Sequence, residues 1–184
     1  DHLIIALGSG SDLTRTPGLS EHAFTMKTLS DARRLRAHVI ERLEHADITR
    51  LPEVKKGALT FTVIGGGFSG IETVGEIKEL IDRSLRYYPN INASEIRVVV
   101  LEFADRILNE MPESLAAYAQ NKLNERGIEV QLGVGVAEAT GTQLVTTTGE
   151  VIDTRTIVAT IGNTPAPVVA KMPLTLEQGR ILVR

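Results

Sequence analysis

The sequence predicts an α/β fold, in which a parallel sheet with helices on both faces is joined by a three-stranded antiparallel β-meander. Three observations predict it. An apolar run at residues 59–64 leads through a turn with four glycines into a helical pattern. A second apolar run follows at residues 96–101, so that strand, helix and strand form one βαβ unit, the building block of parallel sheets. Beyond Gly133 the pattern changes to short β-prone runs separated by turns, which is typical of a meander.

Composition places the chain among globular proteins and excludes several classes of function. It has 184 residues, and 20 Lys and Arg against 23 Asp and Glu give a net charge of −3. This balance argues against a surface for nucleic acid or anionic membrane. The chain has no cysteine, so any redox chemistry has to come from a bound cofactor. No apolar run approaches the roughly 18 residues of a membrane span, and we expect a soluble chain.

The N-terminal part is predicted from its turn formers and from one helical pattern. Residues 1–8 form an apolar run that ends in a glycine, which indicates a strand; because this run opens the chain without Met, we expect a fragment of a longer protein. Residues 9–27 are loop-like. Residues 28–47 start with a capping-box spacing and keep their apolar residues on one face, which predicts a helix. Residues 48–57 are predicted to be a linker.

The middle of the chain continues the alternation of strands and helices. The helix after residues 59–64 should end near Tyr88, because Pro89 cannot continue it. The strand at residues 96–101 is almost entirely apolar, as expected for a parallel strand covered on both faces. Another helix is predicted at residues 112–126, closed by a glycine, and a further strand at residues 128–132.

The C-terminal part is predicted to be rich in short strands. β-prone runs separated by turns occur at residues 134–139, 143–147, 151–152 and 156–161. The last residues, 179–184, begin one more strand and stop, which supports the expectation of a fragment. We find no internal repeat and no low-complexity segment.

The glycine turn is the most informative motif. A lone G-x-G-x-x-G pattern is weak, but here it lies between a predicted strand and a predicted helix, the context in which it binds a dinucleotide. Gly65 permits the tight turn, Gly67 lets the backbone approach a pyrophosphate, and Gly70 lets helix and strand pack closely. The phosphate would lie at the helix N-terminus. The alternative is a turn that binds nothing. The candidate site comprises Gly65, Gly66, Gly67, Phe68, Ser69 and Gly70.

Glu102 follows the second strand of the βαβ unit. A carboxylate there can accept hydrogen bonds from both hydroxyls of an adenosine ribose and would repel a 2′-phosphate, which favours NAD(H) over NADP(H). It lies 32 residues after Gly70, whereas the usual interval is roughly 20, and the long helix and the loop after Pro89 account for the difference. The alternatives are an ordinary solvent-facing strand end, or pairing with Arg106, which could instead favour NADP(H).

The position of Glu72 near the start of the helix has two interpretations, one structural and one functional. A carboxylate near a helix N-terminus is stabilised by the helix dipole wherever it occurs, yet the same position would face a bound nicotinamide.

The remaining arginine, histidine and aromatic side chains are predicted to have structural or solvent-exposed positions and no role in a binding site. The arginines at 33, 34, 36 and 42 are expected on a solvated helix face. The four histidines show no metal-ligand spacing, so we expect no metal site and solvated side chains at His38 and His45. Phe68, Tyr87 and Tyr88 are expected to be packing groups.

With these residues in place, the chain resembles the flavoprotein reductases that bind two dinucleotides (the pyridine nucleotide-disulphide oxidoreductase superfamily), and within them the type II NADH dehydrogenases, or NADH:quinone oxidoreductases. Residues 1–9 resemble the strand that closes the first part of the family's FAD domain. The glycine turn with Glu72 resembles its NADH fingerprint, and Glu102 with residues 105–108 resembles its ribose strand and the following turn. Residues 159–165 resemble the motif at which the chain returns to the FAD domain.

This resemblance implies a central NADH-binding domain at residues 28–165. Residues 1–27 would then be a remnant of the FAD domain with a connecting loop, and residues 166–184 the segment returning to it. Gly8 and Gly162 would contact cofactor. The implied cofactors are NAD(H) and, in the full-length protein, FAD, and the implied partners are the remaining FAD domain and quinone, with a homodimer as a candidate assembly.

The implied reaction passes a hydride from NADH to FAD and electrons on to quinone, at the cytoplasmic face of a membrane that the protein reaches only through regions outside this chain. The FAD fingerprint and the motif that holds the flavin ribityl chain are missing from the 184 residues, so we expect the chain alone to bind NADH and to be inactive. Two alternatives stay open: the nucleotide domain of a disulfide reductase of the same fold, and a non-catalytic module that senses NADH.

Overall fold

The structure is a computed structural model that describes residues 3–177 and 179–183. Its helices are α1 (Leu19–His22), α2 (Leu29–Ile48), α3 (Pro52–Ala58), α4 (Phe68–Ser84) and α5 (Glu113–Glu125). The short 3₁₀ helices are η1 (Leu85–Tyr87), η2 (Ala93–Glu95) and η3 (Pro167–Lys171). Among the described residues, no helix is both long and apolar enough to cross a membrane.

The central element is a parallel five-stranded sheet with the strand order β2-β9-β3-β4-β5. Its strands are β2 (Phe24–Thr25), β3 (Thr60–Ile64), β4 (Arg97–Glu102), β5 (Ile128–Leu132) and β9 (Thr156–Ala159). Every residue of β3 is buried. This pattern is what a central strand shows when both faces of its sheet are covered.

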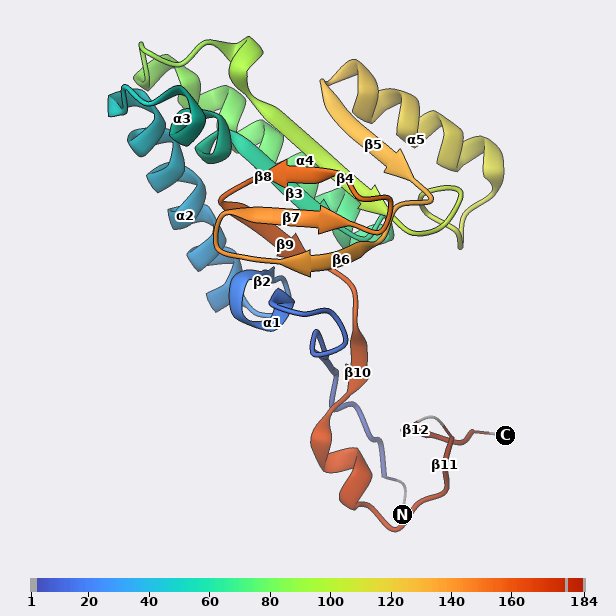
Figure 1. The fold of residues 1–184 in the computed structure, drawn as a ribbon. Coiled ribbons are helices and arrows are strands. Elements are labelled where there is room, and N and C mark those ends of the chain that lie inside the picture. Colours follow the sequence, from blue (N-terminus) through green and yellow to red (C-terminus); the bar gives the residue numbers. More distant parts are fainter. Residues whose placement is uncertain (1–2, 178, 184) are drawn as a thin grey trace.

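The smaller sheets are antiparallel. The meander consists of β6 (Val136–Ala139), β7 (Gln143–Thr146) and β8 (Val151–Asp153). β1 (Ser9–Ser11) pairs with β10 (Asn163–Pro165), and β11 (Leu176–Glu177) pairs with β12 (Arg180–Ile181). In Figure 1 β10 extends away from the main sheet, and β11 and β12 lie beyond it.

Two apolar clusters lie on opposite faces of the main sheet. On one face Val39 of α2, Ile81 of α4 and Leu123 of α5 pack against Val98 and its neighbours. On the other face the meander and α1 contribute side chains that pack against Val99 and the residues beyond it. Figure 1 shows the meander strands lying across the sheet. The long helices therefore share one face, and the meander with the short α1 covers the other.

The predicted α/β class, the parallel sheet and the three-stranded meander are confirmed. The prediction of helices on both faces needs correction, because the long helices share one face and the meander with the four-residue α1 covers the other. The capping box of α2 is also present: the Thr28 hydroxyl accepts from the Asp31 backbone N–H, and Asp31 accepts from the Thr28 N–H. α4 and η1 together end at Tyr87, next to the predicted end, and Gly127 closes α5 at a φ of 74°.

The strand predicted at residues 1–8 was wrong for the described residues 3–8, which are in no strand; Asp1 and His2 lie outside the described residues. Leu3 and Ile4 are 84% and 88% exposed. An apolar sequence alone does not make a strand, because a strand also needs a partner for its backbone groups. Pairing begins at Ser9, opposite Pro165.

Three other predictions also need correction. The loop predicted at residues 9–27 contains β1, α1 and β2. The linker predicted at residues 48–57 is largely α3, which starts with Pro52 at a position where the missing N–H costs nothing. The run at 156–161 supplies β9, which inserts between β2 and β3 of the parallel sheet rather than extending the meander. The terminal strand is the two-residue β12, and Arg184 lies outside the described residues.

Candidate functional site

The glycine turn lies at the carboxyl end of β3, between that strand and α4. The backbone N–H of Gly65 donates to the Leu101 carbonyl at 2.9 Å, and the Leu108 N–H donates to the Gly66 carbonyl at 2.9 Å. The turn is thus tied to β4 and to the segment after it. Ligands of open parallel sheets bind at this edge, beyond the carboxyl ends of the strands.

Three of the four glycines are required by the packing of the protein itself. Gly65 has a φ of +105°, which side chains rarely adopt. A Cβ on Gly66 would lie 2.8 Å from Cγ2 of Ile107, and a Cβ on Gly70 would lie 1.8 Å from the Gly65 carbonyl oxygen. These contacts let α4 begin close against β3, as the motif predicts.

Gly67 differs from the other three because the space beside it is open. A Cβ there would meet no protein atom within 4 Å, and its φ of −73° suits any residue. Gly67 is also the N-cap of α4, and among the described residues no side chain caps this helix. Its first N–H groups and the helix dipole therefore point to a space that suits an anion. Phe68 and Ser69, the first helical residues, are exposed.

Glu102 ends β4 beside this space, and two backbone groups fix its carboxylate. Oε2 accepts the Gly66 N–H at 2.5 Å, and Oε1 accepts the Ala104 N–H at 2.8 Å. Each carboxylate oxygen has two lone pairs, so each can still accept a hydrogen bond from a ligand. The glycine turn and the predicted ribose selector are therefore joined directly.

The pairing of Arg106 with Glu102, considered from sequence, was wrong. Nε of Arg106 donates to Oδ1 of Asn109 at 3.0 Å, and a terminal nitrogen donates to the Asn109 carbonyl at 2.9 Å. In the described part of the chain no ion pair joins Arg106 to Glu102. The turn that carries Arg106 ends at Leu108, whose φ of +49° is unusual for a residue with a side chain.

Glu72 is exposed and is the fifth residue of α4. It lies beyond the first turn, where the dipole acts most strongly, so the electrostatic explanation is weakened. It lines a groove of about 580 Å³ between α2 and α4. The other lining residues are Met26, Ala32, Leu35, Arg36, Val39, Thr73, Glu76, Ile77, Glu79, Leu80 and Arg83.

Gly162 and Gly8 lie at opposite ends of the β1–β10 pair. Gly162 has a φ of +74°, and a Cβ on it would be 2.3 Å from the Asp12 carbonyl oxygen. It is two residues from Thr160 and so close to the glycine turn. Gly8 precedes Ser9, which pairs with Pro165 at the far end, and nothing in the structure brings it to the turn.

Thr160 is a residue of this region that the sequence did not single out. Its hydroxyl donates to the Ile64 carbonyl at 2.9 Å and lies 3.3 Å from the Gly65 carbonyl. It therefore supports the entry into the turn from the neighbouring strand. The signal in the sequence was its place within residues 159–165, the segment that resembles the return to the FAD domain, but that resemblance gave Thr160 no role at the glycine turn.

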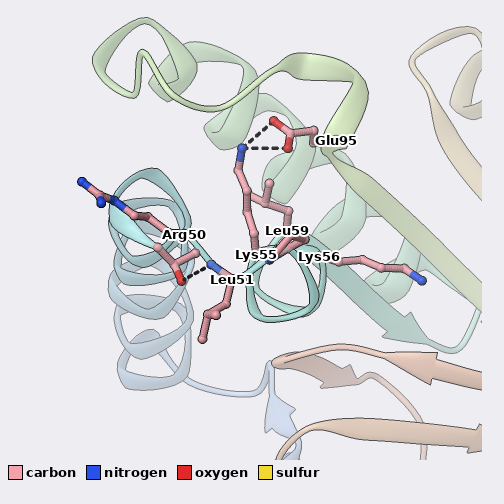
Figure 2. A pocket seen from close by; sticks show the side chains of 8 residues that line it. Arg50, Leu51, Lys55, Lys56, Leu59 and Glu95 are labelled. Carbon is pink, nitrogen blue, oxygen red and sulfur yellow. Dashed lines mark hydrogen bonds and ion pairs between the residues drawn. The ribbon is translucent and has the colours of Figure 1, made fainter.

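A second cavity, of about 400 Å³, lies at the opposite edge of the sheet and is lined in part by Leu59, which precedes β3. Figure 2 shows Lys55 reaching Glu95 while Lys56 extends away from Arg50. Nζ of Lys55 lies 2.7 Å from the nearer Glu95 oxygen and donates to the Asn90 carbonyl at 2.8 Å. Of the cations that line this cavity, Lys55 therefore holds the loop before β4.

The aromatic and histidine predictions were partly wrong. Phe68 and Tyr87 are 49% and 67% exposed, so they are not packing groups, whereas Tyr88 does pack against the core. His38 is half-buried, with Nε2 3.0 Å from both the Arg155 carbonyl and the Thr156 hydroxyl. Burial and the nearby Arg42 charge lower the pKa of His38. His38 is therefore not the solvated side chain that was predicted, whereas His45 is exposed as predicted.

The described residues contain no group of three or more His, Asp or Glu side chains that could hold a metal ion. The arrangement instead brings together the open space at Gly67, a helix N-terminus and an oriented carboxylate. It does not bring Gly8 to them, and it leaves Glu72 on the groove beside them.

Comparisons with known proteins agree with this geometry. The family model for pyridine nucleotide-disulphide oxidoreductases matches residues 1–184. The type II NADH:quinone oxidoreductase Ndh of Mycobacterium tuberculosis is 34% identical over 139 residues, which are 75% of this chain and 30% of that protein. The external alternative NAD(P)H-ubiquinone oxidoreductase B2 of Arabidopsis thaliana mitochondria is 36% identical over 135 residues, 72% of this chain and 23% of that protein.

A solved structure, NDH2 from Plasmodium falciparum in complex with NADH, matches with a TM-score of 0.83 over 90% of this chain and 35% of that one. The two sequences are 18% identical, so this likeness concerns the fold. The chain thus spans about a quarter to a third of the length of these relatives.

Proposed function

Because the chain belongs to the pyridine nucleotide-disulphide oxidoreductase family, we propose that it is the NADH-binding domain of a flavin-dependent NADH dehydrogenase. The observation that carries this proposal is the contrast among the glycines. Gly65, Gly66 and Gly70 are closed in by protein atoms, while the space at Gly67 is open. A glycine that the fold itself does not need indicates that a ligand approaches the backbone there.

In this proposal the pyrophosphate of NADH lies against Gly67 and the first N–H groups of α4. The carboxylate of Glu102, held by the Gly66 and Ala104 N–H groups, accepts hydrogen bonds from the adenosine ribose. Glu72 lies on the nicotinamide side. Gly162 and Gly8 are proposed to face a second cofactor where the chain enters and leaves the domain.

The proposed domain comprises residues 28–165, with residues 1–27 and 166–184 belonging to the connection with an FAD domain. The glycine turn and Glu102 fit NADH, because the Gly66 N–H, next to the open space at Gly67, donates to the Glu102 carboxylate. When bound in the longer protein, FAD supplies the acceptor for the hydride and passes electrons to quinone. The residues of this chain bind and orient NADH, and none is required as an acid or a base.

The relatives support quinone as the electron acceptor, since the Mycobacterium protein is named an NADH:quinone oxidoreductase and the Arabidopsis protein an NAD(P)H-ubiquinone oxidoreductase. We also propose that the longer protein works at the cytoplasmic face of a membrane and assembles as a homodimer.

The test compares Gly67→Ala with Gly75→Ala. Both positions lie at or in α4, and a Cβ at Gly75 makes only an ordinary contact of 3.7 Å with Arg126. We expect Gly67→Ala to weaken NADH binding about tenfold or more, because the methyl group occupies the space of the pyrophosphate. Gly75→Ala should leave the affinity unchanged. Equal NADH affinities for a folded Gly67→Ala variant and the wild type, measured by calorimetry, would refute the proposed site.

A further inference from the structure

Phe103 is a large apolar side chain that the fold leaves in solvent. It follows Glu102 directly and is 77% exposed, whereas Leu101 before it and Ile107 after it are buried. A phenyl ring this exposed adds little to the core, and leaving it in water is unfavourable. Its position beside an oriented carboxylate therefore calls for an explanation other than packing.

The order of the strands places Phe103 on the adenosine side of the proposed NADH site. The turn with the open space follows β3, Glu102 ends β4, and β5 lies on the far side of β4. A dinucleotide with its pyrophosphate at Gly67 and its ribose at Glu102 continues in the same direction. Its base then lies beyond Glu102, over the ends of β4 and β5, where Phe103 stands.

The backbone on both sides of Phe103 is fastened to the loop after β5. The Val134 N–H donates to the Glu102 carbonyl at 2.9 Å, and the Gly133 N–H donates to the Ala104 carbonyl at 2.8 Å. These bonds hold the segment that carries the ring. The position of Phe103 is thus fixed before any ligand binds, which lowers the entropic cost of using it as a contact.

The ring itself lies against this loop. A Cβ added to Gly135 would be 3.2 Å from Cδ2 of Phe103 and 3.0 Å from Cγ2 of Thr147. The absence of a side chain at Gly135 leaves room for the ring on that side, while most of the phenyl surface is open. The result is a supported aromatic surface at the rim of the site.

We propose that Phe103 is the platform on which the adenine ring of NADH stacks, an assignment that rests on the proposed function. Bases stack on aromatic side chains without needing hydrogen bonds, and such contacts contribute substantially to nucleotide affinity. The residue would therefore set affinity for the adenosine half of the ligand and leave the nicotinamide half unaffected.

The test measures the dissociation constants of NADH, ADP-ribose and reduced nicotinamide mononucleotide for the wild type, Phe103→Ala and Phe103→Tyr. We expect Phe103→Ala to weaken NADH and ADP-ribose about tenfold, which is the range of a lost base–aromatic stack, and to leave the mononucleotide unchanged. Phe103→Tyr should retain the wild-type affinities. Tyr118→Ala is the matched control, because Tyr118 is a 61% exposed aromatic on α5, and it should change none of the three.

A nuclear magnetic resonance measurement separates stacking from a general effect on the site. The adenine H2 and H8 signals of bound ADP-ribose should move upfield in the wild type through the ring current, and this shift should vanish in Phe103→Ala. An unchanged ADP-ribose affinity in folded Phe103→Ala would refute stacking of adenine on Phe103 without contradicting the proposed NADH site. A wild-type chain that binds neither NADH nor ADP-ribose overturns the proposed function and the platform together.

Discussion

Replacing Glu102 by Gln tests the basis of cofactor choice. The carboxylate of Glu102 accepts two backbone N–H groups, from Gly66 at 2.5 Å and from Ala104 at 2.8 Å. A glutamine has one acceptor oxygen, so its NH₂ group would face one of these N–H donors. The substitution removes the negative charge and disturbs the connection to the glycine turn at the same time.

The expected magnitude follows from the hydrogen bonds that a ribose would make to this carboxylate. A hydrogen bond to a charged group contributes about 1.5–3 kcal/mol, and about 1.4 kcal/mol corresponds to tenfold in affinity. We expect the wild type to bind NADH about tenfold or more tightly than NADPH, because the 2′-phosphate meets a carboxylate. In Glu102→Gln the affinity for NADH should fall while the affinity for NADPH falls less or rises, so the preference narrows.

Calorimetry measures the dissociation constants of NADH and NADPH for the wild type, Glu102→Gln and Arg106→Ala, and so shows whether Glu102 sets the cofactor preference. Arg106→Ala should keep the preference, because Arg106 donates to Asn109 and not to Glu102. Thermal unfolding of each variant controls for loss of structure. Equal wild-type affinities for NADH and NADPH, or an unaltered ratio in folded Glu102→Gln, would refute the role of Glu102 while leaving the glycine turn untouched.

Three further outcomes are expected. The purified chain should be colourless and inactive with NADH and quinone, since its sequence contains one dinucleotide fingerprint; a stoichiometric flavin absorption band would contradict this. The hydrogen bond from Arg97, more than any other interaction, holds the pKa of Glu129 below its ordinary value. The pair therefore stabilises the fold above the pKa of Glu129 in the unfolded chain, and this stability is lost as the pH falls through the pKa in the folded chain. The free energy of unfolding should fall less steeply with acidification in Glu129→Gln, and an identical pH dependence would show that the pair does not contribute to stability. Asp31→Ala should lower the free energy of unfolding by about 1 kcal/mol through loss of the α2 capping box, and an unchanged chemical denaturation midpoint would show that the box adds nothing.

The parts of the fold that the sequence predicted are those with local causes. The apolar run of β3, the four glycines and the periodicity of α4 each follow from neighbouring residues, so strand, turn and helix could be expected in order. The capping box at Thr28 is equally local. Glu102 could be singled out because it ends an apolar strand at the edge where ligands bind.

The remaining features depend on partners far along the chain. Thr156 in β9 pairs with Phe61 in β3, and no local pattern distinguishes such a strand from one of a meander. The contact of Glu102 with the Gly66 N–H and the open space at Gly67 likewise arise only when separate segments meet. Exposure of Phe68 could not be predicted either, since a phenylalanine in a helix ordinarily packs.

The pairing of β1 with β10 gives the residues between these two strands a single attachment point. Ser9 lies opposite Pro165 and Ser11 opposite Asn163, so the intervening residues 12–162 depart from and return to the same place. A host protein can accept such an insertion in one surface loop without separating the ends of that loop. We therefore expect that grafting residues 12–162 between two paired strands of an unrelated scaffold leaves the scaffold's own folding intact.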